Sequence, residues 1–201
     1  MWARRDQGEV VVGITSILAA VAGKLTSVTA KPVGREYARG RAMGAIESGR
    51  YFGTLKTPVG GVLASVNAAV LNRPKILSES PYGEGWFARL QPTPLNEDWE
   101  STMGIEEATP ALKSQIAALR VRCFASFPDH EMYELGTECA AVLVKLNDLI
   151  VRIPVGEVVH IVSDDWTAPM EMDRWSTETG QPVVDSRREG NLYHFLVRKV
   201  K

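Results

Sequence analysis

The chain has 201 residues, 45% of them hydrophobic, and a formal net charge of −1, a composition typical of one large or two small globular domains. This charge balance gives no electrostatic reason to expect a nucleic acid or a membrane surface as partner, and no apolar run is long enough to span a bilayer. The start, MWARRDQGE, lacks the apolar core of a signal peptide and two cysteines make no disulfide framework, so we expect a cytoplasmic protein with reduced thiols.

Short strand patterns separated by glycine and proline turns fill the first part of the chain. Thr15 or Ser16 can cap a short helix over Ile17–Ala22, which Gly23 can end. Alternating and β-branched runs predict strands over Glu9–Ile14, Leu25–Ala30, Ala42–Glu47, Tyr51–Lys56 and Val62–Asn67. Many short strands joined by such turns favour a barrel or a sandwich.

A tight turn of Ser48, Gly49 and Arg50 joins two of these strands, so we expect the Arg50 side chain to project into solvent. The surrounding segment Ala42–Asn67 resembles the prosthetic-group hairpin of glycine cleavage system H proteins, in which a Glu-Ser-x-Lys pattern carries lipoate. Glu47 and Ser48 match that pattern, and Arg50 stands at the lysine position. A guanidinium stays protonated in proteins and cannot become acylated as the lysine amine does. The resemblance therefore implies an H-like domain without its lipoyl cofactor.

The same resemblance extends over roughly residues 2–120. VGIT at 12–15, PVGG at 58–61 and PYGEGW at 81–86 match family motifs in order and at sensible spacing. They imply an N-terminal all-β barrel-sandwich hybrid, over residues 1–122, that lacks the lipoyl lysine. In such a domain Arg50 is either a solvated turn residue without a role or a fixed positive charge that contacts an acidic partner or an anionic ligand.

The stretch Gln91–Thr109 is polar, and Pro92 and Pro94 predict irregular backbone there. Helical spacing follows over Pro110–Arg120, with the proline suited to the first turn. We expect Val121–Asp129 to be the crossing between two domains.

From His130 onward, strand and helix patterns alternate. The predicted elements are a strand over Glu131–Leu135, a helix over Cys139–Val151, a strand over Val158–Val162, a helix over Ala168–Thr179, and strands over Val183–Arg188 and Leu192–Lys199. The apolar stripe expected for the first helix is Ala140, Leu143, Val144, Leu146 and Ile150. The order β-α-β-α-β-β predicts a two-layer sandwich and makes the whole chain α+β.

This second pattern, assigned to residues 128–201, resembles the TusA/SirA family of sulfur carriers. The matching pieces are LGTEC at 135–139, PVGEVVHIVSDD at 154–165 and ETGQPVVDSRREGNLYHFLVRK at 178–199. In that family a Gly-Leu-x-Cys-Pro-x-Pro segment places a persulfide-carrying cysteine at the start of the first helix, and Cys139 falls on it. The resemblance therefore implies Cys139 as the sulfur-carrying residue.

A cysteine at a helix N-terminus is favoured as the thiolate, the form that accepts sulfur. We expect a moderately activated Cys139 that reaches solvent and reacts faster than Cys123, for which packing or a resolving role is expected. The sequence departs from the family at Ala140-Ala141-Val142, which replace Pro-x-Pro. The alternative is that Cys139 is a small buried hydrophobe, and burial would favour a non-catalytic protein.

No other constellation predicts catalysis. His130, His160 and His194 are scattered over predicted strands without zinc-type spacing, so we expect no metal site. Asp164 and Asp165 match an acidic pair of the sulfur-carrier family and either cap the following helix or bind a ligand.

Three functions remain open. The first is a sulfurtransferase-type relay that carries sulfur on Cys139 without a bound cofactor, with the H-like domain docking persulfide donors or acceptors, heterodisulfide-reductase-like enzymes or lipoate-dependent enzymes. The second is a non-catalytic adaptor with both reactive positions degenerate. The third, a working lipoyl carrier of glycine cleavage, is opposed by Arg50.

Overall fold

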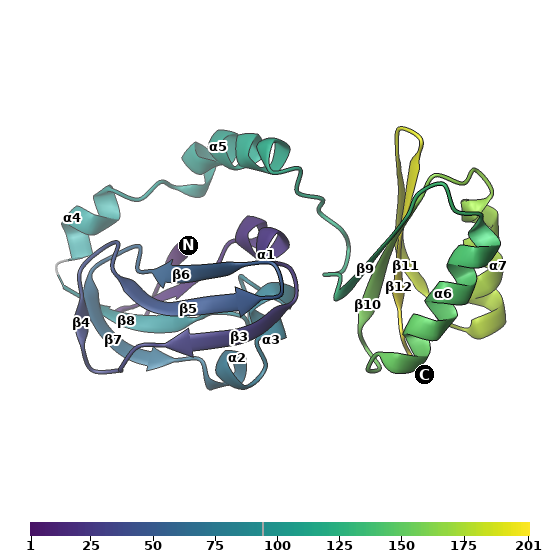
Figure 1. The fold of residues 1–201 in the computed structure, drawn as a ribbon. Helices are drawn as coiled ribbons and strands as arrows, with labels where there is room; N and C mark the ends of the chain where they lie inside the picture. The colour runs from purple at the N-terminus through teal and green to yellow at the C-terminus, as the bar shows by residue number, and fades with distance from the viewer. Residues whose placement is uncertain (94) are drawn as a thin grey trace. The chain divides into compact units, whose positions relative to one another are not determined.

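The computed structural model describes residues 1–93 and 95–201 and divides into two compact units, Met1–Cys123 and Phe124–Lys201 (Figure 1). The division falls inside the predicted crossing segment 121–129. The predicted domain bounds of 1–122 and 128–201 stay a prediction. The predicted α+β class is confirmed, with two antiparallel sheets in the first unit and the order β-α-β-α-β-β in the second unit.

Two antiparallel sheets build the first unit. One has five strands, in the spatial order β1 (Trp2–Asp6), β2 (Glu9–Gly13), β8 (Ala88–Pro92), β7 (Gly61–Val66) and β4 (Glu36–Tyr37). The other has three, in the order β3 (Leu25–Ala30), β5 (Ala42–Ser48) and β6 (Phe52–Lys56). Among the described residues these pairings leave two separate sheets and close no barrel. Strand β1 was not predicted, because its sequence WARRD is polar. It is an edge strand that pairs only with β2.

The two sheets pack against each other around a close approach at Gly44 of β5. A Cβ atom built on Gly44 would lie 2.5 Å from Cζ of Phe87, the fully buried residue that precedes β8. The residues of β2 that face this core are β-branched and completely buried, as the strand pattern predicts. Glycine at position 44 is therefore required by packing rather than by backbone conformation.

Helix α1 (Ser16–Ala22) confirms the predicted caps. The Thr15 hydroxyl accepts the Leu18 N–H at 3.3 Å, and Gly23 ends the helix at a positive φ of 74°. Two further short helices follow β7, namely α2 (Ala68–Asn72) and α3 (Lys75–Glu79).

The expectation of irregular backbone over Gln91–Thr109 is wrong. Strand β8 continues to Pro92 and helix α4 spans Leu95–Glu100, whereas Pro94 lies outside the described residues. Tertiary contacts hold α4, because Asp98 accepts the Gly60 N–H at 2.6 Å and the Arg5 guanidinium lies 4.5 Å from the Trp99 ring centre.

The helix predicted to start at Pro110 begins earlier. Helix α5 spans Ile105–Ala118, with Gly104 in an extended conformation before it and Pro110 inside it. Glu106 and Glu107 lie in its first turn, where carboxylates complement the helix dipole. None of its residues is buried.

The second unit confirms the predicted order of elements. Its sheet runs β11-β12-β10-β9, and β9 and β10 are parallel while the other pairs are antiparallel. Both helices cover the same face of this sheet (Figure 1). The elements are β9 (His130–Glu134), α6 (Cys139–Arg152), β10 (Val158–Ser163), α7 (Ala168–Thr179), β11 (Val183–Glu189) and β12 (Leu192–Arg198).

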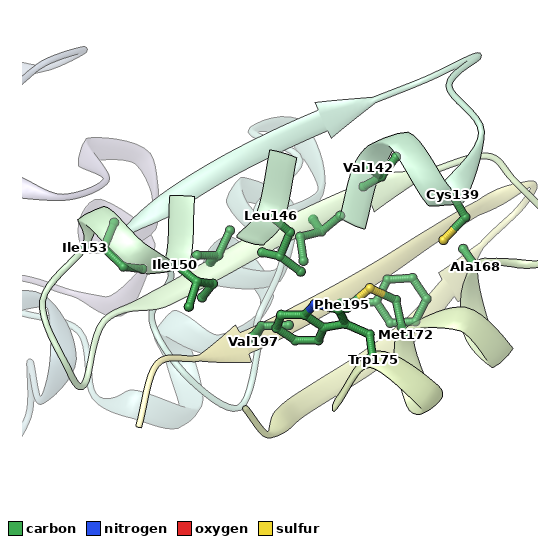
Figure 2. Close-up of a cluster of buried hydrophobic side chains, with 12 residues drawn as sticks. Cys139, Val142, Leu146, Ile150, Ile153, Ala168, Met172, Trp175, Phe195 and Val197 are labelled. Atoms are coloured by element: carbon green, nitrogen blue, oxygen red, sulfur yellow. The ribbon is translucent and has the colours of Figure 1, made fainter. Parts of the chain in front are cut away.

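The core of the second unit lies between the helices and the sheet (Figure 2). Trp175 of α7 donates its indole N–H to the Asn147 side chain of α6 at 2.8 Å, so the large ring is buried with its polar atom satisfied. The apolar residues of this cluster that Figure 2 labels are Cys139, Val142, Leu146, Ile150, Ile153, Ala168, Met172, Trp175, Phe195 and Val197.

Candidate functional site

Cys139 is the first residue of α6 and follows the loop that leaves β9. Because β9 and β10 are parallel, both strands end at the same edge of the sheet. The β9–α6 loop and the β10–α7 loop therefore meet beside Cys139.

Two carboxylates hold these loops together. Asp164 Oδ1 accepts the backbone N–H of Gly136 at 2.8 Å, and Asp165 Oδ2 accepts the backbone N–H of Cys139 at 2.8 Å. We call this pair of hydrogen bonds the clasp. Asp165 Oδ1 also accepts the backbone N–H and the hydroxyl of Thr167, at 2.9 and 2.8 Å. Asp165 therefore binds N–H groups at the starts of both helices.

These contacts stabilise the charged form of Asp165. The Thr167 N–H, the Cys139 N–H and the Thr167 hydroxyl, in that order of effect, hold the pKa of Asp165 below its usual value. The carboxylate consequently stays ionised at neutral pH and remains the acceptor for the Cys139 N–H.

The Cys139 side chain lies inside the apolar core. Its exposed fraction is 4%, and Figure 2 shows its sulfur within the same cluster as Ala168 and Met172. Burial, followed by the charges of Asp165 and Glu171, raises the pKa of the Cys139 thiol from 9.0 to about 11. At pH 7 such a thiol is ionised in about one molecule in ten thousand.

The expectation of an activated Cys139 that reaches solvent is therefore wrong. The helix N-terminus is present as predicted, but the Asp165 carboxylate takes the N–H that would stabilise a thiolate. The buried residues of α6 are Cys139, Val142, Leu146 and Ile150, spaced by three, four and four. This period, rather than the stripe predicted from Ala140, directs the thiol inward.

Arg50 is exposed in the turn between β5 and β6, but its side chain does not project freely into solvent. Its Nη2 donates to the Ala20 carbonyl at 3.0 Å, and its Nε lies 2.7 Å from where a Cβ on Gly23 would be. Ser48 Oγ donates to the Ala22 carbonyl at 2.6 Å. The two side chains bind carbonyls at the C-terminus of α1, where a cation also complements the helix dipole. Arg50 thus has a structural role that the sequence did not show.

Cys123 differs from expectation as well. It is exposed and belongs to the first unit, so the predicted role in a buried core is wrong, and neither cysteine forms a disulfide. The exposed Cys123 is therefore the thiol of this chain that solvent reagents reach directly.

Sequence reasoning also missed a buried histidine pair. His160 Nε2 and His194 Nδ1 lie 3.0 Å apart, on neighbouring strands β10 and β12. Both alternate with residues of the apolar core, so strand periodicity places them on the face away from the helices. Within residues 1–93 and 95–201 no group of three or more His, Cys, Asp or Glu residues is arranged to hold a metal ion.

None of the helices in the described part of the chain combines the length and the hydropathy needed to cross a bilayer.

Comparisons with known proteins identify both units. The family model for the glycine cleavage H-protein matches residues 1–115, and that for sulfurtransferase TusA matches residues 134–199. Glycine cleavage system H protein 5 of Aquifex aeolicus is 31% identical over 123 residues, which cover 61% of this chain and 83% of that protein. Glycine cleavage system H protein 2 of the same organism is 35% identical over 118 residues, covering 59% and 73%.

Among solved structures, a glycine cleavage system H protein from Mycobacterium marinum is similar, at 29% identity and a TM-score of 0.44, with 55% of this chain and 85% of that chain covered. The H-protein family model spans more than half of the chain. The chain therefore belongs to the glycine cleavage H-protein family, with a TusA-type unit fused behind its H-protein unit.

Proposed function

We propose that this protein is a sulfur carrier in which Cys139 accepts sulfane sulfur as a persulfide. The observation that carries the proposal is the position of Cys139, the first residue of α6, in a unit that matches the TusA sulfurtransferase model. The first unit, which has arginine at the lipoyl position, would serve as a docking module for a persulfide-handling or lipoate-dependent enzyme.

Sulfur transfer requires Cys139 to leave its resting geometry, because a buried and protonated thiol neither meets a donor nor attacks it. The two hydrogen bonds of the clasp must break for the β9–α6 loop to open. Hydrogen bonds to a charged group contribute about 1.5–3 kcal/mol each. The open form is therefore a minor population, and a partner that binds it would raise its share.

The transfer step itself needs no external oxidant. The Cys139 thiolate attacks the outer sulfur of a donor persulfide, a new S–S bond forms on Cys139, and the donor S–S bond breaks. The donor leaves as a thiolate and takes up the proton that Cys139 released. Transfer to an acceptor thiolate reverses these roles.

A non-catalytic adaptor is the second candidate, and specific observations favour it. Cys139 is buried with a raised pKa, Ala140-Ala141-Val142 stand where the carrier family has Pro-x-Pro, and the Arg50 side chain binds a carbonyl of α1. In this reading only the surfaces of the two units would be functional.

Intact-mass measurement separates the two candidates. The chain with Cys123→Ser is incubated with a cysteine desulfurase and cysteine. A mass gain of one sulfur atom that is absent in the Cys139→Ser variant supports the carrier. No mass gain in the Cys123→Ser chain, or an equal gain after Cys139→Ser is added to it, supports the adaptor.

A further inference from the structure

Large apolar side chains are exposed beside the clasp. Leu135 precedes Gly136 and Trp166 follows Asp165, so the clasp brings both to the same edge of the second unit. Their exposed fractions are 54% and 79%, and Met170, in the first turn of α7, is 65% exposed. We call these three residues, Leu135, Trp166 and Met170, the Trp166 surface.

The segments that carry this surface are acidic throughout. Residues 134–144 and 163–173 hold six carboxylates and no lysine or arginine, namely Glu134, Glu138, Asp164, Asp165, Glu171 and Asp173. The next cations along the chain are Lys145, which pairs with Glu134, one of the six, and Arg174, which pairs with Glu178. The edge of the unit around Cys139 therefore keeps a net negative charge.

We infer that the Trp166 surface docks a partner protein with a basic face that surrounds an apolar contact. Tryptophan is one of the residue types enriched at the energetic centre of interfaces, and an exposed indole offers a large apolar area. The surrounding carboxylates would steer a basic partner and fix its orientation. This inference describes the partner that would exchange sulfur with Cys139, and it therefore rests on the proposed carrier function.

The charges also argue against other occupants. A symmetric contact between two copies would set six carboxylates against six, because a two-fold interface brings the same patch together. Small anionic sulfur donors, such as polysulfide or thiosulfate, meet the same repulsion in front of a closed clasp. A partner protein bound to Leu135 and Trp166 would, in contrast, contact both loops that the clasp joins. A partner bound at this surface could therefore stabilise the open form of the β9–α6 loop.

The test is site-specific photo-crosslinking of the full chain in the cells that naturally make it. Benzoylphenylalanine replaces Trp166, and in a matched control it replaces Val155, which is 65% exposed in the turn at the opposite end of β10. We expect a heteromeric adduct at position 166 with at least about five times the yield at position 155. The attachment site on the partner should lie among lysines and arginines.

Charge reversal tests whether the carboxylates contribute to binding of the partner. Glu138→Lys together with Glu171→Lys should lower the adduct yield at least about fivefold while the second unit stays folded. Asp148→Lys together with Glu178→Lys makes the same change in net charge farther along the two helices and should leave the yield unchanged. Equal yields at positions 166 and 155, insensitivity to the first reversal, or an adduct between two copies of this chain would each overturn the inference.

The same experiment separates docking from sulfur transfer. The adduct should persist in the Cys139→Ser variant, since the Trp166 surface does not include the thiol. An adduct that persists while Cys139 takes up no sulfur would keep the docking surface and reject the carrier function. Sulfur uptake by Cys139 without a position-specific adduct would keep the carrier and reject the docking surface.

Discussion

The Asp165 carboxylate lies 2.8 Å from the backbone nitrogen of Cys139 and accepts its hydrogen bond. It thereby fills the anion position that the start of α6 offers, and its charge opposes ionisation of the thiol beside it. One residue thus stabilises the helix start and suppresses the reactivity of the cysteine. This relationship determines how Cys139 should respond to substitution and to pH.

Replacement of Asp165 by asparagine should activate Cys139. Asp165→Asn keeps an oxygen acceptor for the N–H but removes the charge, which is the second cause of the raised thiol pKa after burial. In the Cys123→Ser background we expect the pKa of Cys139 to fall below about 11. Its alkylation by iodoacetamide at pH 8 should become at least about threefold faster, since reactivity follows the thiolate fraction.

The pH profile of that alkylation gives the control. Asp148→Asn removes a carboxylate from the exposed side of the same helix, away from the clasp, and should leave the profile of Cys139 unchanged. If Asp165→Asn and Asp148→Asn give the same profile as the parent chain, Asp165 does not control the thiol.

The stability of the second unit should fall in alkaline solution because of Cys139. Its folded-state pKa is raised from 9.0 to about 11, so the folded unit holds the proton more tightly than the unfolded chain does. The stabilisation is fully present below pH 9 and is lost as pH rises through about 11. Urea unfolding of the Cys123→Ser chain at a series of pH values should show this loss. Adding Cys139→Ser should reduce the slope of the free energy of unfolding against pH between pH 9 and about 11. Equal slopes in the two chains would contradict a raised thiol pKa.

The fold was largely predictable, whereas the state of the site was not. Local signals were sufficient for α1 and the β5–β6 hairpin, because a cap at Thr15 and a turn at Ser48-Gly49 specify them by themselves. The helical spacing of Cys139, Val142, Leu146 and Ile150 would have predicted the burial of Cys139. A second apolar set that starts at Ala140 shares two of these residues, and the prediction followed that set instead.

Contacts between distant residues account for what remained unpredicted. The bond between Asp165 and the Cys139 N–H joins residues 26 positions apart, and the Arg50–Ala20 bond joins residues 30 apart. Neither follows from local spacing, since it depends on which loops the sheet brings together. Helix α4 was missed for the same reason, because its anchors Asp98 and Trp99 contact Gly60 and Arg5 far along the chain.

Replacement by alanine should destabilise the first unit at one glycine, Gly44, but not at another, Gly49. Gly44→Ala would place a methyl group against Phe87, which is fully buried, and against the Thr29 backbone, so we expect a loss of about 1–3 kcal/mol in the free energy of unfolding. Gly49→Ala, with open space around it, should change stability by less than about 0.5 kcal/mol. Hydrogen exchange of first-unit peptides in rising urea measures both. A tolerated Gly44→Ala would show that the two sheets are less closely packed.

Lipoylation of the first unit should depend on Arg50 alone. The β5–β6 hairpin and Ser48 are in place, but Arg50, at the position that we propose for lipoyl attachment, binds the Ala20 carbonyl through its guanidinium. We expect a lipoate ligase with lipoate and ATP to leave the mass of the chain unchanged, because a guanidinium does not provide the neutral amine that acylation needs.

Arg50→Lys should gain the mass of one lipoyl group at position 50, mapped by peptide digestion. Arg50→Lys keeps a cation at the C-terminus of α1, so its cost in stability should stay below about 1 kcal/mol. Arg50→Ala is the control that loses the same contact with α1 but offers no amine. Lipoylation of the unchanged chain would refute the assignment of Arg50 as the block, and an unmodified Arg50→Lys chain would show that the hairpin has also lost its recognition by the ligase.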